Sequence, residues 1–410
     1  MNKMEQVKIL RKLAHQYYEQ AMDPVNFERM QLHRAVNDLK MQRPVVLMNE
    51  IPFHELNVDG SLTLQCEDPV LRLAEEYMRR KLFQWRYFPA DMILPPYVPV
   101  KKVMEDSGIG IEVKEEQLSV DSRNEIVSHE YYDQLRTVED IEKIKLPVIT
   151  YNYKETMKQY TKLAEAIGDI VPVRMEGHNC YLSPWDQIST YRGVTNLLID
   201  LVDDPEFSHK VVNKIYECEE SRLQQMEEQG LFELTPYDIH CTSSLNSDLP
   251  GGYDGGKVMR KNIWGRGMAQ IFSSVGKAMH EEFDIDYMKR AMEPFGLVYY
   301  GCCEPLDKKI DIVEKLPHLR KVSITPWADV DVAAEAIGSR YVMANKPNPA
   351  AVSVKLDEDA LRREIGRTLA AVKRNGCSCD IVLKDISSAG NDLNNLVRWE
   401  RIVMEMVEDF

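Results

Sequence analysis

The sequence lacks any long apolar run. No stretch approaches the roughly 18 residues that a membrane-spanning helix requires. Residues 1–15 alternate charged and apolar side chains and do not contain the apolar core of a signal peptide. We therefore expect a cytoplasmic protein with no membrane partner.

The sequence also has little positive charge and few cysteines. Lysine and arginine number 51 against 66 aspartates and glutamates, which gives a formal net charge of -15. Nucleic acid and anionic membranes would repel such a chain. The eight cysteines are scattered over 410 residues, which is unlike a disulfide framework, so we expect reduced thiols.

What the sequence does contain is an alternation of short β-type runs with amphipathic helical stretches from residue 44 onward. The first 40 or so residues are helical in pattern, with Pro24 between two halves. Eight strand candidates follow, at residues 45–48, 91–94, 171–175, 237–240, 298–301, 321–324, 341–344 and 381–383. Eight βα units predict a (β/α)8 barrel at residues 43–410, preceded by an N-terminal helical extension at residues 1–42. Charge-rich residues 106–140 indicate an excursion or small hairpin inserted early in the barrel.

Reactive side chains gather where these strand candidates end, which is where barrel enzymes carry their chemistry. The fifth candidate breaks at Gly301 into Cys302-Cys303-Glu304. A cysteine thiolate from Cys302 or Cys303 and the imidazole of His240 are groups that commonly bind zinc. We expect them to lie close together because they follow neighbouring strands. Glu176, His178 or Cys180 would complete the set.

Less reactive interpretations stay open for several of these residues. Free cysteines are commonly buried, so Cys302 and Cys303 equally fit inert packing. Cys377 and Cys379 precede the last strand candidate and so lie at the wrong end of the barrel for ligands. Glu50 and His54 follow the first candidate and face either the barrel mouth or solvent. Glycine-rich residues 249–256 exclude regular structure and predict either a mobile loop over the mouth or a surface turn.

Two stretches resemble the uroporphyrinogen decarboxylase superfamily. The first is Tyr191-Arg192-Gly193 followed by Asp203-Asp204-Pro205, and the second runs from Tyr299 to Asn345-Lys346-Pro347-Asn348-Pro349. The resemblance covers roughly residues 165–405 and implies a (β/α)8 barrel. It also implies either decarboxylation of a tetrapyrrole without a cofactor or methyl transfer between a corrinoid and a thiol with the help of zinc.

The residues favour the methyltransferase branch of this resemblance. The arginine motif of the decarboxylases is missing near residues 43–55, and their late histidine–glycine pair is missing at residues 385–387. The His-x-Cys zinc motif of the methyltransferases is Tyr300-Gly301-Cys302 here, and their distant cysteine falls near Ile386. The cysteine therefore matches while the histidine does not, and the ligands would have been redistributed to Cys303, Glu304 and His240.

The sequence therefore predicts a methyltransferase that moves a methyl group between a small-molecule donor or acceptor and a corrinoid carried by a separate protein, with zinc assistance. The predicted metal ligands are Cys302, Cys303 and His240. The predicted catalytic residues are Glu176, Asp238 and Glu304, and the predicted substrate-binding residues are Glu50, His54, His178, Asn345 and Asp385. Two alternatives remain, a uroporphyrinogen decarboxylase-like carboxy-lyase and a non-catalytic barrel that binds a ligand or a corrinoid protein.

Overall fold

The fold is mixed α/β, built around a parallel sheet. The computed structural model describes residues 2–118 and 128–410. Within this part, seven parallel strands form one sheet, in the order β1 (Val45–Met48), β15 (Ser378–Leu383), β14 (Val342–Asn345), β13 (Leu319–Ile324), β12 (Leu297–Tyr300), β11 (Trp264–Gly267) and β8 (Cys180–Leu182). Because all neighbours are parallel, their carboxyl ends meet at one edge, as the prediction of βα units requires.

Two further strands form a separate parallel pair beside this sheet. They are β2 (Val98–Lys101) and β7 (Val173–Glu176). The chain passes from β7 into β8 through Gly177, where a Cβ atom would lie 2.3 Å from the carbonyl oxygen of Phe232. This close backbone approach falls at the break between β7 and β8.

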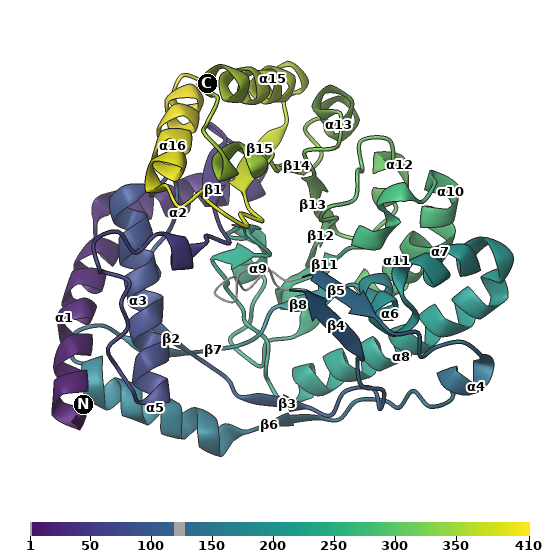
Figure 1. Cartoon of the computed structure of the whole chain (residues 1–410), viewed down its shortest axis with the longest axis horizontal. Coiled ribbons are helices and arrows are strands. Elements are labelled where there is room, and N and C mark those ends of the chain that lie inside the picture. The colour runs from purple at the N-terminus through teal and green to yellow at the C-terminus, as the bar shows by residue number, and fades with distance from the viewer. Residues whose placement is uncertain (1, 119–127) are drawn as a thin grey trace.

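Helices follow the strands and cover the outer side of the sheet (Figure 1). The later ones are α10 (Lys277–His280), α11 (Asp286–Met292), α12 (Ile310–Val313), α13 (Val330–Ile337), α14 (Ala350–Ser353), α15 (Glu358–Asn375) and α16 (Leu393–Glu408). Helix α15 shows why the chain folds locally as it does. Asp357 caps its first turn, and Gly376 ends it in the left-handed conformation with φ +64°.

The earlier helices fall into two groups. On one side lie α1 (Lys3–Ala21), α2 (Pro24–Asn37), α3 (Pro69–Tyr87) and α5 (Tyr153–Ile167). On the other lie α4 (Val138–Ile141), α6 (Pro184–Arg192), α7 (Val194–Asp203) and α8 (Pro205–Glu228). Helix α1 buries Leu10, Ala14 and Tyr17 at helical spacing in a cluster shared with α3 and α5, so the N-terminal helices pack on the rest of the fold.

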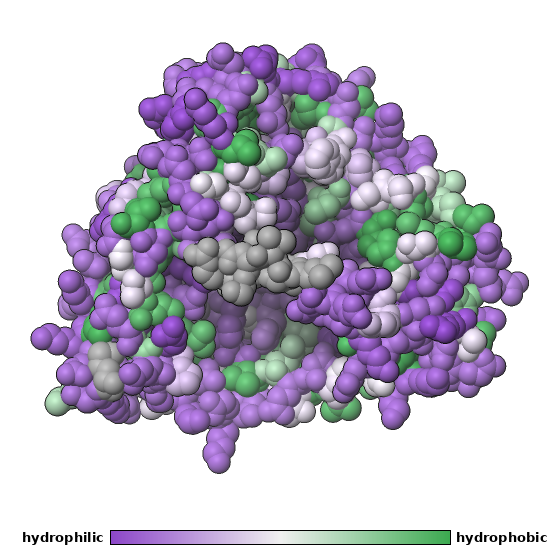
Figure 2. All heavy atoms as spheres, in the orientation of Figure 1, coloured by the Kyte–Doolittle hydropathy of each residue, from purple (hydrophilic) through white to green (hydrophobic). Residues whose placement is uncertain are grey.

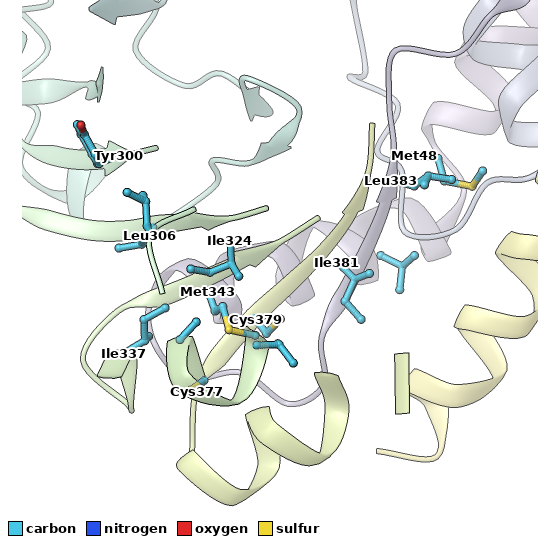
Figure 3. Close-up of a cluster of buried hydrophobic side chains, with 14 of the residues drawn as sticks. Met48, Tyr300, Leu306, Ile324, Ile337, Met343, Cys377, Cys379, Ile381 and Leu383 are labelled. Atoms are coloured by element: carbon cyan, nitrogen blue, oxygen red, sulfur yellow. The ribbon is translucent and has the colours of Figure 1, made fainter. Parts of the chain in front are cut away.

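The main core lies between the sheet and its outer helices. Figure 3 shows part of it, including Ile324, Met343 and Ile381 from three neighbouring strands. Cys377 and Cys379 belong to the same apolar cluster. This placement agrees with the expectation that these two thiols are not ligands. The face of the molecule in Figure 2 is hollowed near its centre, and hydrophilic residues surround much of the hollow.

Two strand predictions were wrong. Residues 91–94 form no strand, and β2 follows them instead. Residues 237–240 contribute only β9 (Asp238–Ile239), which pairs antiparallel with β10 (Thr242–Ser243), while β11 takes the expected place in the sheet. Strand β11 was missed because Gly265 and Gly267 weaken its β pattern. A Cβ atom at Gly265 would lie 2.7 Å from the side chains of Met292 and Phe295, so only glycine fits.

Two other segments, the early insertion and the glycine-rich residues, differ in part from what the sequence predicts. The early insertion predicted at residues 106–140 contains β4 (Glu115–Leu118) and β5 (Ser128–Tyr131), which pair antiparallel, and its residues 119–127 lie outside the described residues. The strands β3 (Met104–Asp106) and β6 (Ile149–Tyr151), also antiparallel, flank it. Residues 249–256 were predicted to lack regular structure, yet α9 (Asp248–Gly251) begins there. Asp248 forms an ion pair with Arg320 at the amino end of β13, so this segment lies opposite the carboxyl edge and is not a lid over it.

A buried ion pair crosses the interior of the sheet. Lys321 Nζ on β13 lies 2.7 Å from Asp380 Oδ2 on β15, and both side chains are fully buried. Removing one member of such a pair leaves a buried charge without compensation, which typically costs about 3–5 kcal/mol.

We therefore expect Lys321→Met to lower the free energy of unfolding by about 3 kcal/mol or more, as measured by urea denaturation. The exposed Arg340–Glu314 ion pair provides the control, since Arg340→Ala should cost less than about 1 kcal/mol. Equal effects of the two substitutions would contradict the importance of the buried pair.

Candidate active site

Cys302 is held rigidly just past the end of β12. Gly301 turns the chain there with φ +93°, and a Cβ atom at this position would lie 2.4 Å from Leu306 Cδ1. The Cys302 backbone N–H donates to Glu304 Oε2 at 2.8 Å, and its carbonyl accepts from Ser323 Oγ at 2.9 Å. These bonds fix where the thiol points.

The Cys302 sulfur is surrounded by hydrogen-bond donors and cations. His240 Nε2 lies 3.0 Å from Sγ, and Cys303 Sγ lies 3.7 Å away. Lys346 and Lys384 follow β14 and β15 and each place Nζ 3.8 Å from the same sulfur. The hydrogen bond from Cys303, helped by His240 and Lys346, outweighs burial and holds the pKa of Cys302 far below that of an ordinary thiol. These surroundings favour the thiolate form of Cys302.

The neighbours of this thiolate have shifted pKa values too. Its hydrogen bond to Cys302 and its burial raise the pKa of Cys303, which stays protonated. Burial lowers the pKa of His240, so a neutral imidazole donates from Nε2 to the sulfur. Burial would also lower the pKa of Lys384, but the charges of Cys302 and Glu50 outweigh it and raise that pKa. The site thus pairs an anionic sulfur with a cationic amine.

His240 reaches the sulfur from the tip of the β9–β10 hairpin. His240 and Cys241 form its two-residue turn, with φ of +45° and +68°. Turns with both central residues at positive φ fit the twist of a hairpin but favour asparagine and glycine. His240 and Cys241 are larger than the residues that such turns favour. This indicates that the turn is retained for the side chains that it carries.

The buried ion pair anchors this hairpin inside the curve of the sheet. Lys321 Nζ donates to Thr242 Oγ1 at 3.0 Å and to the Ser243 carbonyl at 2.6 Å. Thr242 in turn donates to Asp380. The same two charges that join β13 and β15 therefore set the position of His240.

Two acidic residues in strained backbone conformations complete the cluster. Glu50 follows β1 with φ +53°, and Asp385 follows β15 with φ +57°. Glu50 accepts from the Cys241 thiol at 3.1 Å and from the Asp385 backbone N–H at 2.8 Å. Of the eight non-glycine residues with positive φ in the described chain, four thus meet here. Such strain concentrates at functional sites.

Two cavities open beside this cluster. One of about 540 Å³ is lined by Cys302, Cys303, Lys346, Lys384 and the exposed ring of Trp327. The other, of about 710 Å³, is lined by Glu50, His54 and several residues of α3. Asp385 lines both, so the two cavities share a wall. Their sizes suit small-molecule ligands.

The structure brings some of the predicted site residues together with Cys302. Cys303, His240, Glu50 and Asp385 all lie around the sulfur or its contacts. Glu304 is fully buried beneath it, where it accepts from the Cys302 and Ala269 backbones rather than facing substrate. His54 lines the larger cavity, and Asn345 is buried at the end of β14.

Other predicted residues lie elsewhere. Glu176 forms an ion pair with Lys101 and lines a third cavity together with Asp238. His178 Nε2 bonds to the Lys102 carbonyl at 2.8 Å, which is a structural contact. Cys180 is buried in the main core. These side chains therefore do not join Cys302.

The predicted zinc ligands do not fit a metal ion as they are placed. Among residues 2–118 and 128–410, no three His, Cys, Asp or Glu side chains meet in a group able to hold one. The ammonium groups of Lys346 and Lys384 occupy the surroundings of the thiolate and would repel a dication. Zinc binding thus stays a prediction from the sequence. The positive charges beside the thiolate in the structure are those of Lys346 and Lys384.

Sequence reasoning overlooked the roles of Lys346 and Lys384. Each stands directly at the end of a predicted parallel strand, as Asn345-Lys346 and Leu383-Lys384-Asp385. Lysine there is ordinarily taken as solvated, but both are at most 3% exposed. A lysine directly at the end of a short buried β-type run was the available signal.

We expect iodoacetamide to modify Cys302 at a rate that stays nearly flat from about pH 9 down to about pH 6, because its lowered pKa preserves the thiolate. An ordinary thiol loses reactivity about tenfold per unit below its pKa of roughly 8.5. Lys346→Met should move the decline of the Cys302 rate to higher pH. Peptide mass spectrometry at each pH gives the rates, with the denatured protein as reference, and a Cys302 profile matching that reference would refute the thiolate.

Comparisons with known proteins reveal only a distant likeness. No family model matches the sequence, and no curated protein matches it. Among solved structures, the chain is similar to a methyltransferase from Methanosarcina mazei, with 11% sequence identity and a TM-score of 0.48 over 92% of this chain and 98% of that one. A likeness at this level assigns neither family nor activity, and the resemblance to the uroporphyrinogen decarboxylase superfamily stays a prediction. No helix in the described residues has the length and apolar character needed to cross a bilayer.

Proposed function

We propose that this protein is a methyltransferase in which the Cys302 thiolate takes a methyl group from a small-molecule donor and passes it to a corrinoid carried by a separate protein. The observation that carries this proposal is the thiolate itself. It is bonded to His240 at 3.0 Å, flanked by two lysines at 3.8 Å, and lines a cavity of about 540 Å³. A thiolate kept ionised beside a substrate-sized space is equipped for nucleophilic attack.

The position of Cys302 supports the same function. The proposal takes the fold as a (β/α)8 barrel in which β2 lies next to β1, and β7 and β8 are two segments of one barrel strand. Cys302, Lys346 and Lys384 then follow three of its strands at the carboxyl edge, where barrel enzymes hold their reacting groups. The rigid backbone bonds of Cys302 limit the motion of the nucleophile before reaction.

The transfer step needs no proton. Cys302 Sγ attacks the methyl carbon, an S–C bond forms, and the bond to the leaving group breaks with its electron pair going to the leaving group. The hydrogen bond from Cys303 and the charges of Lys346 and Lys384 favour the ionised sulfur in the free enzyme, and His240 orients it through Nε2. The Cys302 thioether that results is neutral.

A donor with a single positive charge on its methyl-bearing atom suits the chemistry of this step, because the Cys302 thiolate attracts that charge against the repulsion of Lys346 and Lys384. A sulfonium or quaternary ammonium leaves as a neutral sulfide or amine, so no acid is required at the leaving group. Trp327 lines the cavity with 71% of its surface exposed, and an open indole face attracts such cations. Asp385 also lines this cavity, and Glu50 lies in the neighbouring one.

The second transfer regenerates the thiolate. A thioether gives up its methyl group only to a strong nucleophile, and the Co(I) state of a corrinoid is one. Cobalt would supply the electron pair for the new bond, and the S–C pair returns to Cys302. The charges of Lys346 and Lys384 favour that return because they stabilise the thiolate as the leaving group.

We expect incubation with trimethylsulfonium ion to add the mass of one methylene to the peptide containing Cys302. Addition of cob(I)alamin should then yield methylcobalamin and restore the free thiol. Cys302→Ser should abolish both changes, and the other cysteines of the same sample serve as internal controls. Methylcobalamin formation that survives Cys302→Ser would sink the mechanism. A protein that binds the donor without any transfer would favour the non-catalytic alternative.

A further inference from the structure

The thiolate has a second thiol next to it in the chain. Cys302 and Cys303 are adjacent residues, and their sulfurs lie 3.7 Å apart with a hydrogen bond between them. Both line the same cavity, and Cys303 is partly exposed while Cys302 is almost wholly buried. A small molecule that enters the cavity therefore meets both sulfurs together.

We infer that Cys302 and Cys303 are a reversible oxidation site, at which a hydroperoxide converts the two thiols to a disulfide between adjacent residues. This inference goes beyond methyl transfer and does not depend on it. It rests on the contact between the two sulfurs and on their different surroundings, with Cys302 facing two ammonium groups and His240.

The chemistry proceeds in two balanced steps. The Cys302 thiolate attacks the outer oxygen of the hydroperoxide, an S–O bond forms, and the O–O bond breaks with its electron pair leaving as alkoxide or hydroxide, which takes a proton from solvent. The Cys303 sulfur then attacks the Cys302 sulfenic acid. An S–S bond forms, the S–O bond breaks, and the Cys303 proton leaves with the hydroxide as water.

Adjacency makes the product easy to reduce. Consecutive Cα atoms are only about 3.8 Å apart, whereas disulfides ordinarily join Cα atoms about 4.4–6.8 Å apart. The bond would therefore be strained, and strained disulfides have the higher, more oxidising potentials typical of labile bridges. A dithiol reductant supplies the two electrons that reopen it.

The remaining cysteines of the described chain compete poorly. Cys241 is the nearest candidate by position, but its thiol is engaged with Glu50 at 3.1 Å. Five others are buried: Cys66, Cys180, Cys218, Cys377 and Cys379. Oxidation should therefore stay within the Cys302–Cys303 pair, and it converts the nucleophilic thiolate that methyl transfer requires into a disulfide.

Hydrogen peroxide treatment of the purified protein, followed by alkylation and peptide mass spectrometry, tests this inference. We expect the Cys302–Cys303 peptide to lose the mass of two hydrogens, to resist alkylation and to recover with dithiothreitol. The reaction should be roughly tenfold or more faster than that of an ordinary thiol, which is only a few per cent ionised at about pH 7.

Three variants separate the roles of the thiols. Cys303→Ser should stop at a Cys302 sulfenic acid that dimedone traps, and Cys302→Ser should leave Cys303 reduced. Cys241→Ser should still form the disulfide. A bridge from Cys302 to Cys241, a bridge between two chains, or direct oxidation to the sulfinic acid would each overturn the proposal. Because the readout is the oxidation state of the sulfurs, failure here leaves the methyl-transfer test untouched, and the reverse also holds.

Discussion

The arrangement of the site depends on the Lys321–Asp380 ion pair. It joins two strands of the sheet at a depth where neither side chain contacts solvent, and its polar atoms hold the β9–β10 hairpin. Without that anchor, a two-residue turn made of His240 and Cys241 has no local reason to form, because both residues disfavour positive φ. A buried ion pair, which is costly to desolvate, thus holds the β9–β10 hairpin in a conformation that the backbone preferences of His240 and Cys241 disfavour.

Pairing of opposite charges explains why so many ionisable groups share a small volume. One thiolate and two carboxylates face two ammonium groups, and each charge has an opposite charge within 4 Å. The pairing is centred on one residue, since Lys384 contacts Cys302, Glu50 and Asp385 at once. A change in the charge of any one member therefore shifts the pKa values of the others.

Much of the architecture was predictable from the sequence, and the site was predictable only in outline. The strands near residues 45, 298, 321, 341 and 381 were readable because buried parallel strands are continuous apolar runs. Strand β11 was not predictable, because its packing against Met292 and Phe295 requires glycine at a position where a recognisable β pattern has a large apolar side chain. Cys302 and His240 were predicted as neighbours from their places beside strand candidates, although His240 arrives on a hairpin. Burial of Lys346 and Lys384 arises from tertiary packing, which no local pattern records.

The strained turn has an evolutionary consequence. Glycine at position 241 would relieve a left-handed backbone conformation that costs on the order of 1 kcal/mol for other residues, so the folded state would gain stability from losing the Cys241 side chain. Selection for stability alone would drift the hairpin tip toward glycine or asparagine. Histidine and cysteine at this tip therefore do not serve the stability of the fold, and what the turn provides in exchange is the hydrogen bond from His240 to Cys302.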